Sequence, residues 1–227
     1  MGTGKYDTLF VDFYGTLVTG DRAAVEATCR SVVEDFALPM TAPELALTWG
    51  KRFFEAIDTC NHDGFLTLFE CECRTLRETL HPLVGDIDPT PYVQMLKDYW
   101  SAPPPVPDLH QALGAIKIPI CVVSNADTED ILCAIERLRL PVSEVVTSQD
   151  ARSYKPDPAI FQQALEKTGT DPRRVLHAGD SLHSDVGGAE RMGMATCWVC
   201  YEDRILDVGT SRADYKIRNL LELRKIT

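Results

Sequence analysis

The chain has 227 residues, of which 44% are hydrophobic and 25% are charged, and its formal net charge is −11. This length and composition are typical of a globular protein that buries a sizeable core in one large domain or two small ones. An acidic protein gains nothing from the counterion release that drives nucleic-acid binding, so we expect no nucleic-acid partner. No apolar stretch approaches the roughly 18 to 20 residues needed to span a bilayer, so we expect no membrane partner either.

The N-terminus and the cysteines bear on the cellular compartment. The first six residues lack the apolar segment of a secretory signal. The chain has 8 cysteines, but it is too long and too rich in core residues to be a small disulfide-stapled protein. Cys197 and Cys200 form a CxxC pattern, and no second pair completes a zinc site. We therefore expect reduced thiols in a cytoplasmic protein.

The first predicted element is a short buried strand over Thr8–Val11, an apolar run that ends at Asp12. Asp12 opens the hexapeptide Asp-Phe-Tyr-Gly-Thr-Leu. An aspartate at the carboxyl end of a strand, followed by a glycine turn, lies where open α/β sheets bind ligands. Taken alone, such an aspartate is often only a turn or cap residue, so the interpretation depends on the rest of the chain.

Helical patterns with apolar faces follow between about Gly20 and Tyr99, and no strand intervenes. They cover Arg22–Phe36, Pro43–Asp58, Phe65–Leu80 and Pro91–Trp100. The stretch is too long for an ordinary loop, which predicts a helical subdomain inserted after the first strand. The proline-rich segment 102–107 is a stiff linker back to the core. We assign residues 19–100 to the helical insertion and residues 1–18 and 101–227 to the core.

The remainder of the chain alternates between strand and helix. The predicted strands are Pro119–Ser124, Glu144–Ser148, Val175–Gly179 and Ala195–Val199. The predicted helices between and after them are Ala126–Arg139, Asp157–Thr168 and His183–Met192. Such alternation implies right-handed crossovers and a parallel sheet. The predicted fold class is therefore α/β, a doubly wound, Rossmann-like parallel sheet with an inserted helical domain.

Polar residues follow three of the later strands. Ser124 and Asn125 precede a helix whose free N–H groups can hold an anion. Lys155 precedes Pro156 and so lies on a rigid loop. Asp180 and Asp185 flank a short loop, and their oxygens suit Mg²⁺. Each feature also has a plain structural explanation: a helix N-cap, a surface lysine, or carboxylates favoured by a helix dipole.

Together and in this order, the four segments resemble the motifs of the haloacid dehalogenase-like hydrolase superfamily. The resemblance implies that Asp12 is a nucleophile that forms a covalent ester with the substrate. It implies that Lys155 neutralises both this nucleophile and the substrate anion. It also implies that the helical domain is a cap that closes over the active site.

The same resemblance supplies the binding roles. Ser124 and Asn125, with Thr16 of the first motif, are implied to bind the phosphate or carboxylate of a small-molecule substrate. The implied cofactor is Mg²⁺, with ligands Asp12, the Tyr14 backbone carbonyl, Asp180 and Asp185. His183 lies between the last two and is interpreted as a loop residue rather than a ligand.

Tyr14 is the main departure from the phosphatases of this superfamily. Those enzymes usually place a second aspartate two residues after the nucleophile, where it protonates the leaving oxygen and later activates water. Tyrosine has a reference pKa of about 10, so it is a poor general base near neutrality. We keep Tyr14 as a catalytic candidate because of its position. The pattern Asp-x-Tyr-Gly-Thr-Leu resembles the 2-haloacid dehalogenases, in which a halide leaves without a proton.

The fourth motif resembles the phosphatases instead. The dehalogenases carry a Ser-Ser-Asn-x-x-Asp pattern and use no metal, whereas this chain has Gly-Asp-Ser-Leu-His-Ser-Asp. The dehalogenase cap also supplies an arginine after a Leu-Trp pair. Here Gly50 follows Thr48-Trp49, with Lys51 and Arg52 next.

These observations favour a Mg²⁺-dependent phosphatase acting on a small phosphorylated metabolite through an aspartyl-enzyme intermediate. Two acidic residues aimed at an anion site would repel the substrate unless a cation neutralised them. One alternative is a metal-independent dehalogenase acting on a 2-haloacid. Another is a catalytically weak relative used for binding or regulation, since residue 14 is not an acid.

Overall fold

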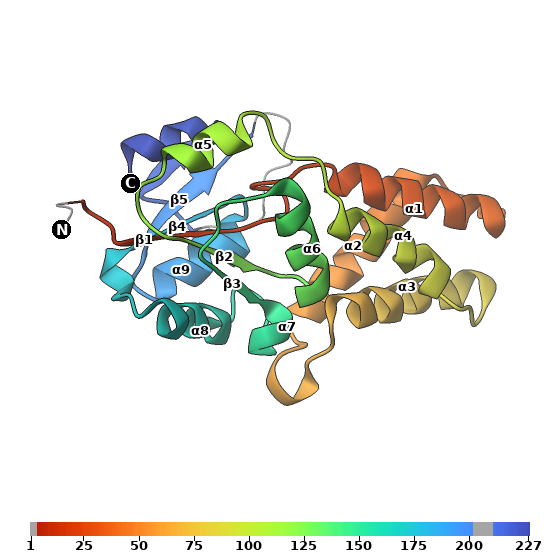
Figure 1. Cartoon of the computed structure of the whole chain (residues 1–227). Helices are drawn as coiled ribbons and strands as arrows, with labels where there is room; N and C mark the ends of the chain where they lie inside the picture. The colour runs from red at the N-terminus through yellow and green to blue at the C-terminus, as the bar shows by residue number, and fades with distance from the viewer. Residues whose placement is uncertain (1–3, 202–210) are drawn as a thin grey trace.

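The computed structural model describes residues 4–201 and 211–227. One parallel sheet of six strands forms the core, in the order β3-β2-β1-β4-β5-β6 (Figure 1). The strands are β1 Thr8–Val11, β2 Ile120–Ser124, β3 Glu144–Thr147, β4 Val175–Gly179, β5 Ala195–Val199 and β6 Tyr215–Ile217. The strand order reverses at β1, which pairs with β2 on one side and β4 on the other. This order confirms the predicted doubly wound α/β fold.

Helices cover both faces of the sheet. One face carries α5 (Leu109–Ala115), α6 (Thr128–Leu138) and the 3₁₀ segment η4 (Leu220–Lys225), and the other carries α8 (Pro158–Thr168) and α9 (Gly187–Arg191). Central strand β1 serves both layers: Leu9 and Val11 pack toward the first set, and Phe10 packs toward the second. Burial on both faces explains why the strands are apolar without alternation. Short segments α7 (Ser148–Ala151) and η2 (Pro172–Arg174) complete this part.

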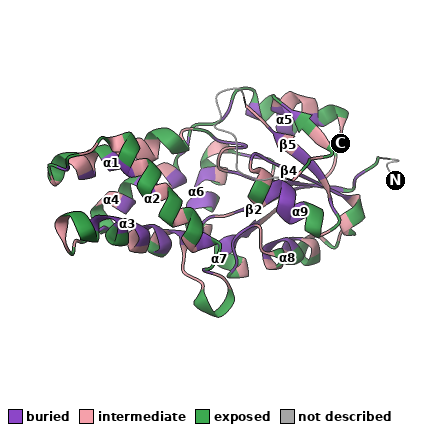
Figure 2. Cartoon of the chain, turned by 180° about the vertical axis from the view of Figure 1, so that it is seen from behind, coloured by how far each residue is buried: buried purple, intermediate pink, exposed green. Residues whose placement is uncertain are grey.

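A group of helices between β1 and α5 forms a second body with its own apolar interior. Its helices are α1 (Asp21–Asp35), α2 (Ala42–Ile57), α3 (Leu68–Val84) and α4 (Thr90–Ser101), with the short segment η1 (His62–Gly64). Their buried faces turn inward and their exposed faces outward (Figure 2). Capping boxes at Thr41 and Thr67 fix the starts of α2 and α3. We propose that residues 19–100, which hold these helices, act as the cap of a core made of residues 1–18 and 101–227.

Two acidic residues at the start of α6 attach this body to the core. Asp127 accepts hydrogen bonds from the backbone N–H groups of Leu68 and Phe69, at 2.7 and 3.0 Å, at the first turn of α3. Asp130 forms a 2.7 Å ion pair with Lys97 of α4. Because α6 follows β2, these contacts place the ends of α3 and α4 next to the carboxyl edge of the sheet.

The boundaries differ from the prediction mainly after β4. The helix expected over His183–Met192 begins instead as a π-helical turn, η3 (Leu182–Val186), and continues as α9. The Ser181 hydroxyl accepts the N–H of Ser184, which holds this wider turn. The chain also contains α5, α7, β6 and η4, which the sequence did not predict because they are short. In the described part of the chain, no helix is long and apolar enough to cross a membrane.

The close contact between α9 and α8 predicts that stability is sensitive to a larger side chain at Gly188. A Cβ atom at Gly188 would overlap the ring of Phe161, which is fully buried. We expect Gly188→Ala to lower the free energy of unfolding by about 1 to 3 kcal/mol, since overpacking forces neighbours to move. Gly114→Ala in α5 is the control, because a Cβ there meets nothing within 4 Å. It should cost nothing and can gain up to about 1 kcal/mol of helix propensity. Urea titrations measure the free energy of unfolding of both variants, and equal values for the two would contradict the packing argument.

Candidate active site

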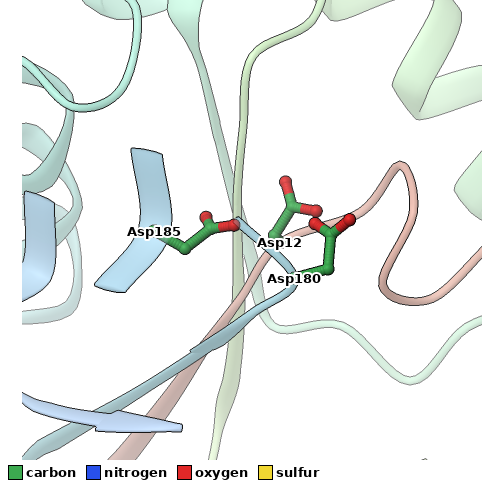
Figure 3. Close-up of side chains that lie close together, drawn as sticks. All are labelled: Asp12, Asp180 and Asp185. Atoms are coloured by element: carbon green, nitrogen blue, oxygen red, sulfur yellow. The ribbon is translucent and has the colours of Figure 1, made fainter. Parts of the chain in front are cut away.

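Three buried carboxylates meet at the carboxyl edge of the sheet. Asp12 follows β1, Asp180 follows β4, and Asp185 lies in η3. One oxygen from each lies within 4.8 Å of the other two (Figure 3). Parallel pairing of β1 with β4 explains the meeting of the first two, because parallel strands end at the same edge. Like charges about 4 Å apart repel by about 4 kcal/mol near a protein surface, so this group calls for positive charge.

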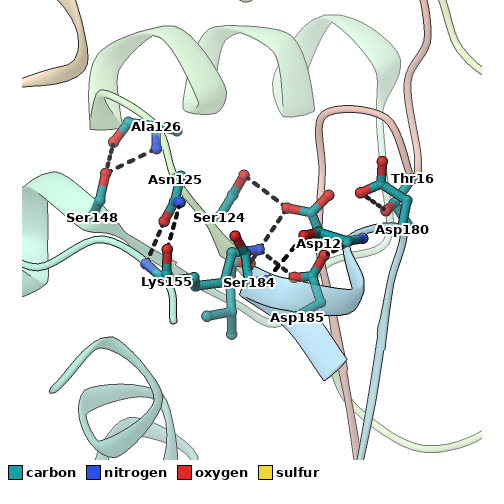
Figure 4. A network of polar contacts seen from close by, with 12 residues as sticks. Asp12, Thr16, Ser124, Asn125, Ala126, Ser148, Lys155, Asp180, Ser184 and Asp185 are labelled. Atoms are coloured by element: carbon teal, nitrogen blue, oxygen red, sulfur yellow. Dashed lines mark hydrogen bonds and ion pairs between the residues drawn. The ribbon is translucent and has the colours of Figure 1, made fainter. Parts of the chain in front are cut away.

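Lys155 supplies positive charge between two of these carboxylates. Its Nζ lies 2.7 Å from Asp12 Oδ1 and 2.6 Å from Asp185 Oδ1 (Figure 4). Nζ also donates to the Val123 carbonyl at 2.9 Å, and Lys155 is only 2% exposed. Burial alone would lower the pKa of Lys155, but the two carboxylates outweigh burial and raise it. Lys155 is therefore a charged ammonium group that pairs at once with Asp12 of the first motif and Asp185 of the fourth.

Asp185 has a second support, His177. Its Oδ1 lies 3.0 Å from Nε2 of His177, and its Oδ2 accepts the Ser181 N–H at 3.1 Å. Burial would raise the pKa of Asp185, but Lys155 and His177 outweigh it and hold this pKa well below its usual range. The sequence analysis missed His177, although a histidine in the middle of the apolar strand β4 was a signal. The structure gives this histidine the role of orienting Asp185.

Asp12 is less fully paired than Asp185. Its Oδ1 accepts hydrogen bonds from Lys155 and from the Ser124 hydroxyl, the latter at 3.3 Å. Its Oδ2 is buried and accepts no hydrogen bond from the described residues. Burial and the neighbouring Asp185 raise the pKa of Asp12, against the opposing pull of Lys155. A buried carboxylate oxygen without a donor marks a position for a cation or a ligand.

The residues predicted to bind substrate have different surroundings. The Ser124 hydroxyl lies at Asp12, as expected for a group beside the nucleophile. The Thr16 hydroxyl donates to Asp180 Oδ1 at 3.1 Å, so it orients a carboxylate. The Asn125 side chain bonds both the N–H and the carbonyl of Lys155, at 2.7 and 3.2 Å. We therefore propose that Thr16 and Asn125 position neighbouring site residues.

Tyr14 directs its hydroxyl to the helical body. The hydroxyl donates to the Trp100 carbonyl of α4 at 2.8 Å. Gly15 has a φ of 86°, a positive value that glycine adopts readily, and this conformation permits the tight turn after Tyr14. Burial raises the pKa of Tyr14, and the nearby carboxylate of Asp130 adds to the shift. With its proton donated to a carbonyl and its pKa raised, this phenol is a poor source or acceptor of protons for catalysis.

Several other candidate residues lie away from the carboxylates. His183 lies in η3 rather than in a loop; it is half exposed, and its Nε2 lies 3.4 Å from Oδ1 of Asp58. On α2, Lys51 is exposed, and Arg52 lies 3.6 Å from Glu78 on the outer surface of α3. Neither basic side chain therefore faces the interior of the helical body.

Comparison with known proteins identifies the family. The family described as haloacid dehalogenase-like hydrolase matches residues 6–193. The chain belongs to this family. Its core, with an aspartate after the first strand and a lysine and two further aspartates beside it, therefore belongs to a hydrolase.

Individual members of the haloacid dehalogenase-like family that resemble the chain differ in activity. Haloacetate dehalogenase H-2 from Moraxella sp. (strain B) is 23% identical over 201 residues, which cover 86% of each chain. Pyrimidine 5'-nucleotidase YjjG from Escherichia coli (strain K12) is 35% identical over 100 residues, 42% of this chain and 44% of that protein. The structure of L-2-haloacid dehalogenase from Xanthobacter autotrophicus superimposes with a TM-score of 0.79 at 18% identity, covering 97% of this chain and 98% of that chain. This likeness shows the fold.

The shared ion pair predicts a large cost for removing Lys155. In metal-free protein, Lys155→Met should lower the free energy of unfolding by about 3 kcal/mol or more, because buried carboxylates lose their partner. The cost should shrink at about pH 4, where those carboxylates can take up protons. Lys167→Met is the control, since Lys167 pairs with Glu144 on the surface and such pairs contribute about 1 kcal/mol or less. Denaturant titrations at two pH values measure both, and equal losses in the two variants would contradict a special role for Lys155.

Proposed function

We propose that this family member is a Mg²⁺-dependent phosphatase that acts on a small phosphate monoester through an aspartyl-phosphate intermediate. The observation that carries the proposal is that Asp12 and Asp185 share a single cation, Lys155, among the described residues, with Asp180 close beside them. A substrate phosphate would add further negative charge. A bound divalent cation resolves this conflict, whereas a metal-free site would repel an anionic substrate.

The residues present fit Mg²⁺. Magnesium prefers oxygen ligands and is usually held by a few carboxylates together with water and substrate oxygens. Asp12, Asp180 and Asp185 offer such oxygens close together, and Oδ2 of Asp12, which accepts no hydrogen bond from the described residues, is suited to bind the ion. The Tyr14 carbonyl is the fourth proposed ligand. When bound, the ion would supply positive charge that stabilises the transferring phosphoryl group.

The protein's own residues divide the remaining work. Lys155 and Ser124 hold Oδ1 of Asp12, which orients the carboxylate for attack on phosphorus. A carboxylate oxygen forms a bond to phosphorus while the bond from phosphorus to the ester oxygen breaks. Water then attacks the acyl phosphate, which releases phosphate and restores the Asp12 carboxylate. Because the Tyr14 hydroxyl is bonded to Trp100, the leaving oxygen takes its proton from solvent.

A metal-independent 2-haloacid dehalogenase is the second candidate. It is favoured by Tyr14, by the similarity to haloacetate dehalogenase over most of the chain, and by the structural match to a haloacid dehalogenase. Against it stand the fourth motif, which has Asp180 before Asp185 where that group carries Ser-Ser-Asn-x-x-Asp, and the outward positions of Lys51 and Arg52. These positions leave α2 without a basic group to cradle a halide, so we favour the phosphatase.

A substrate panel with and without metal tests the proposal. Phosphate monoesters and short 2-haloacids are supplied to EDTA-treated protein and to protein with Mg²⁺. We expect phosphate release that depends on Mg²⁺, since the ion supplies charge worth several kcal/mol to the transition state. Asp180→Asn should weaken Mg²⁺ binding in calorimetry. Halide release that is undiminished by EDTA would establish the dehalogenase instead, and turnover of neither class would indicate a binding or regulatory protein.

Asp12→Asn tests the nucleophile. The amide has nearly the shape of the carboxylate but is far less nucleophilic. We expect turnover to fall by at least about 10³-fold, while circular dichroism and unfolding remain those of a folded protein. Ser143→Ala, on the loop before β3 and remote from Asp12, is the control: it should keep full activity after the same expression and purification. Retention of full activity by folded Asp12→Asn protein would exclude this mechanism.

A further inference from the structure

Glu72 is a buried carboxylate that the proposed chemistry does not use. It lies on the buried face of α3 and is only 8% exposed. Within residues 4–201 and 211–227, its side chain takes part in no hydrogen bond or ion pair. Buried acidic side chains are almost always paired, because an isolated ionised carboxylate away from water is very costly. The Glu72 oxygens are not among the fully buried polar atoms that lack a partner, so the carboxylate keeps a small solvent-facing surface that a ligand can reach.

Glu72 lies one helical turn from the end of α3 that contacts the core. Leu68, one helical turn before Glu72 and on the same face of α3, donates its N–H to Asp127. Asp127 comes three residues after Ser124, whose hydroxyl bonds Asp12. The turn of α3 that carries Glu72 thus follows the turn whose backbone binds Asp127, three residues after Ser124.

The surroundings of Glu72 contain negative and neutral groups. Burial raises the pKa of Glu72 well above its ordinary value, and the Asp21 carboxylate at the start of α1 adds to the shift. Burial and then Glu72 raise the pKa of Cys29 in α1 to about 12. Burial, with smaller effects from acidic neighbours that include Glu72, raises the pKa of Tyr154, the residue before Lys155. No lysine or arginine among the described residues offsets the charge of Glu72, so this place in the cap favours a cationic group over an anionic one.

We propose that Glu72 determines specificity by receiving the ammonium group of an aminoalkyl phosphate, whose phosphate lies at Asp12 and Lys155. This inference rests on the proposed phosphatase function. The substrate class is the phosphate monoesters of amino alcohols. Such a molecule carries a primary amine, and its hydroxyl group is esterified with phosphate. The ammonium supplies the partner that the carboxylate lacks, and the same carboxylate disfavours substrates with a second anionic group at that end.

An unpaired Glu72 also makes the free protein less stable at high pH. The folded protein holds a proton on Glu72 that the unfolded chain releases near pH 4.5, the group's ordinary pKa. Stability is therefore lost as the pH rises from this value through the raised pKa. Glu72→Gln removes that loss, so its melting temperature should exceed that of the wild type by a margin that grows with pH. Among the described residues, the titratable groups on other elements that interact electrostatically with Glu72 are Asp21 and Cys29 of α1 and Tyr154 of the core loop.

Binding of stable substrate analogues tests the specificity directly. Aminoalkyl phosphonates of two to four carbons are compared by calorimetry, in Mg²⁺, with alkyl phosphonates in which a methyl group replaces the ammonium. The wild type should bind the best amine about 10- to 100-fold more tightly than its neutral partner, as expected for a hydrogen bond between charged groups. Glu72→Gln should abolish this ratio, and Glu78→Gln, on the exposed face of α3, should keep it.

The outcomes separate the inference from the proposed function. Equal binding of amines and neutral partners by the wild type, or an unchanged ratio in Glu72→Gln, overturns the role of Glu72 while the phosphate site stands. Failure of every phosphonate to bind overturns the phosphate site, and with it the inference that depends on that site. A higher melting temperature for Glu72→Gln at about pH 8 shows that the variant is folded, so a lost ratio cannot be attributed to unfolding.

Discussion

The ammonium group of Lys155, shared between Asp12 and Asp185, is the interaction on which the rest of the site depends. These side chains come from the loop after α7, the end of β1 and the turn after β4, so the ion pairs hold only if all three segments keep their places. The parallel register of β1 with β4 and the backbone clamp of Asn125 on Lys155 secure those places. Within the described part of the chain, Asp12 and Asp185 thus share one buried cation, and that shortage of positive charge is what makes the site suited to a divalent ion.

The sequence predicted the core of this arrangement because the relevant signals are local. β1, β4 and β5 have the predicted limits, since apolar and β-branched runs between polar residues define short buried strands. The motif residues at the strand ends then meet because parallel strands share an edge. The sequence did not predict the role of His177, which depends on where Asp185 lies, or the π-helical turn of η3, which the hydrogen bond from Ser184 to Ser181 holds. A histidine inside a strand gives no sign of its partner until Asp185 is placed 3.0 Å away.

Tyr14 and the start of α6 show how the helical body and the core are joined at the site. Tyr14 belongs to the first motif, yet its hydroxyl bonds the backbone of α4. Asp127 follows the second motif, yet its carboxylate binds the first turn of α3. Pattern analysis treats residue 14 as a replaced acid, whereas the geometry shows a structural link that a shorter carboxylate would not reproduce. The chemistry at residue 14 and the placement of the cap are therefore linked through one side chain.

Glu72 illustrates why specificity is harder to infer from sequence than catalysis. Catalytic residues occur at strand ends, where the fold itself marks them, but Glu72 is one of several acidic residues on an amphipathic helix. Only its burial beside Asp21, without a cationic partner in the described residues, separates it from Glu70, which closes a capping box, and Glu78, which pairs on the surface. A protein gains no stability from an unpaired buried carboxylate, so its presence is best explained by a ligand that completes it. The charge that is unfavourable in the free cap thereby becomes the means of choosing a substrate.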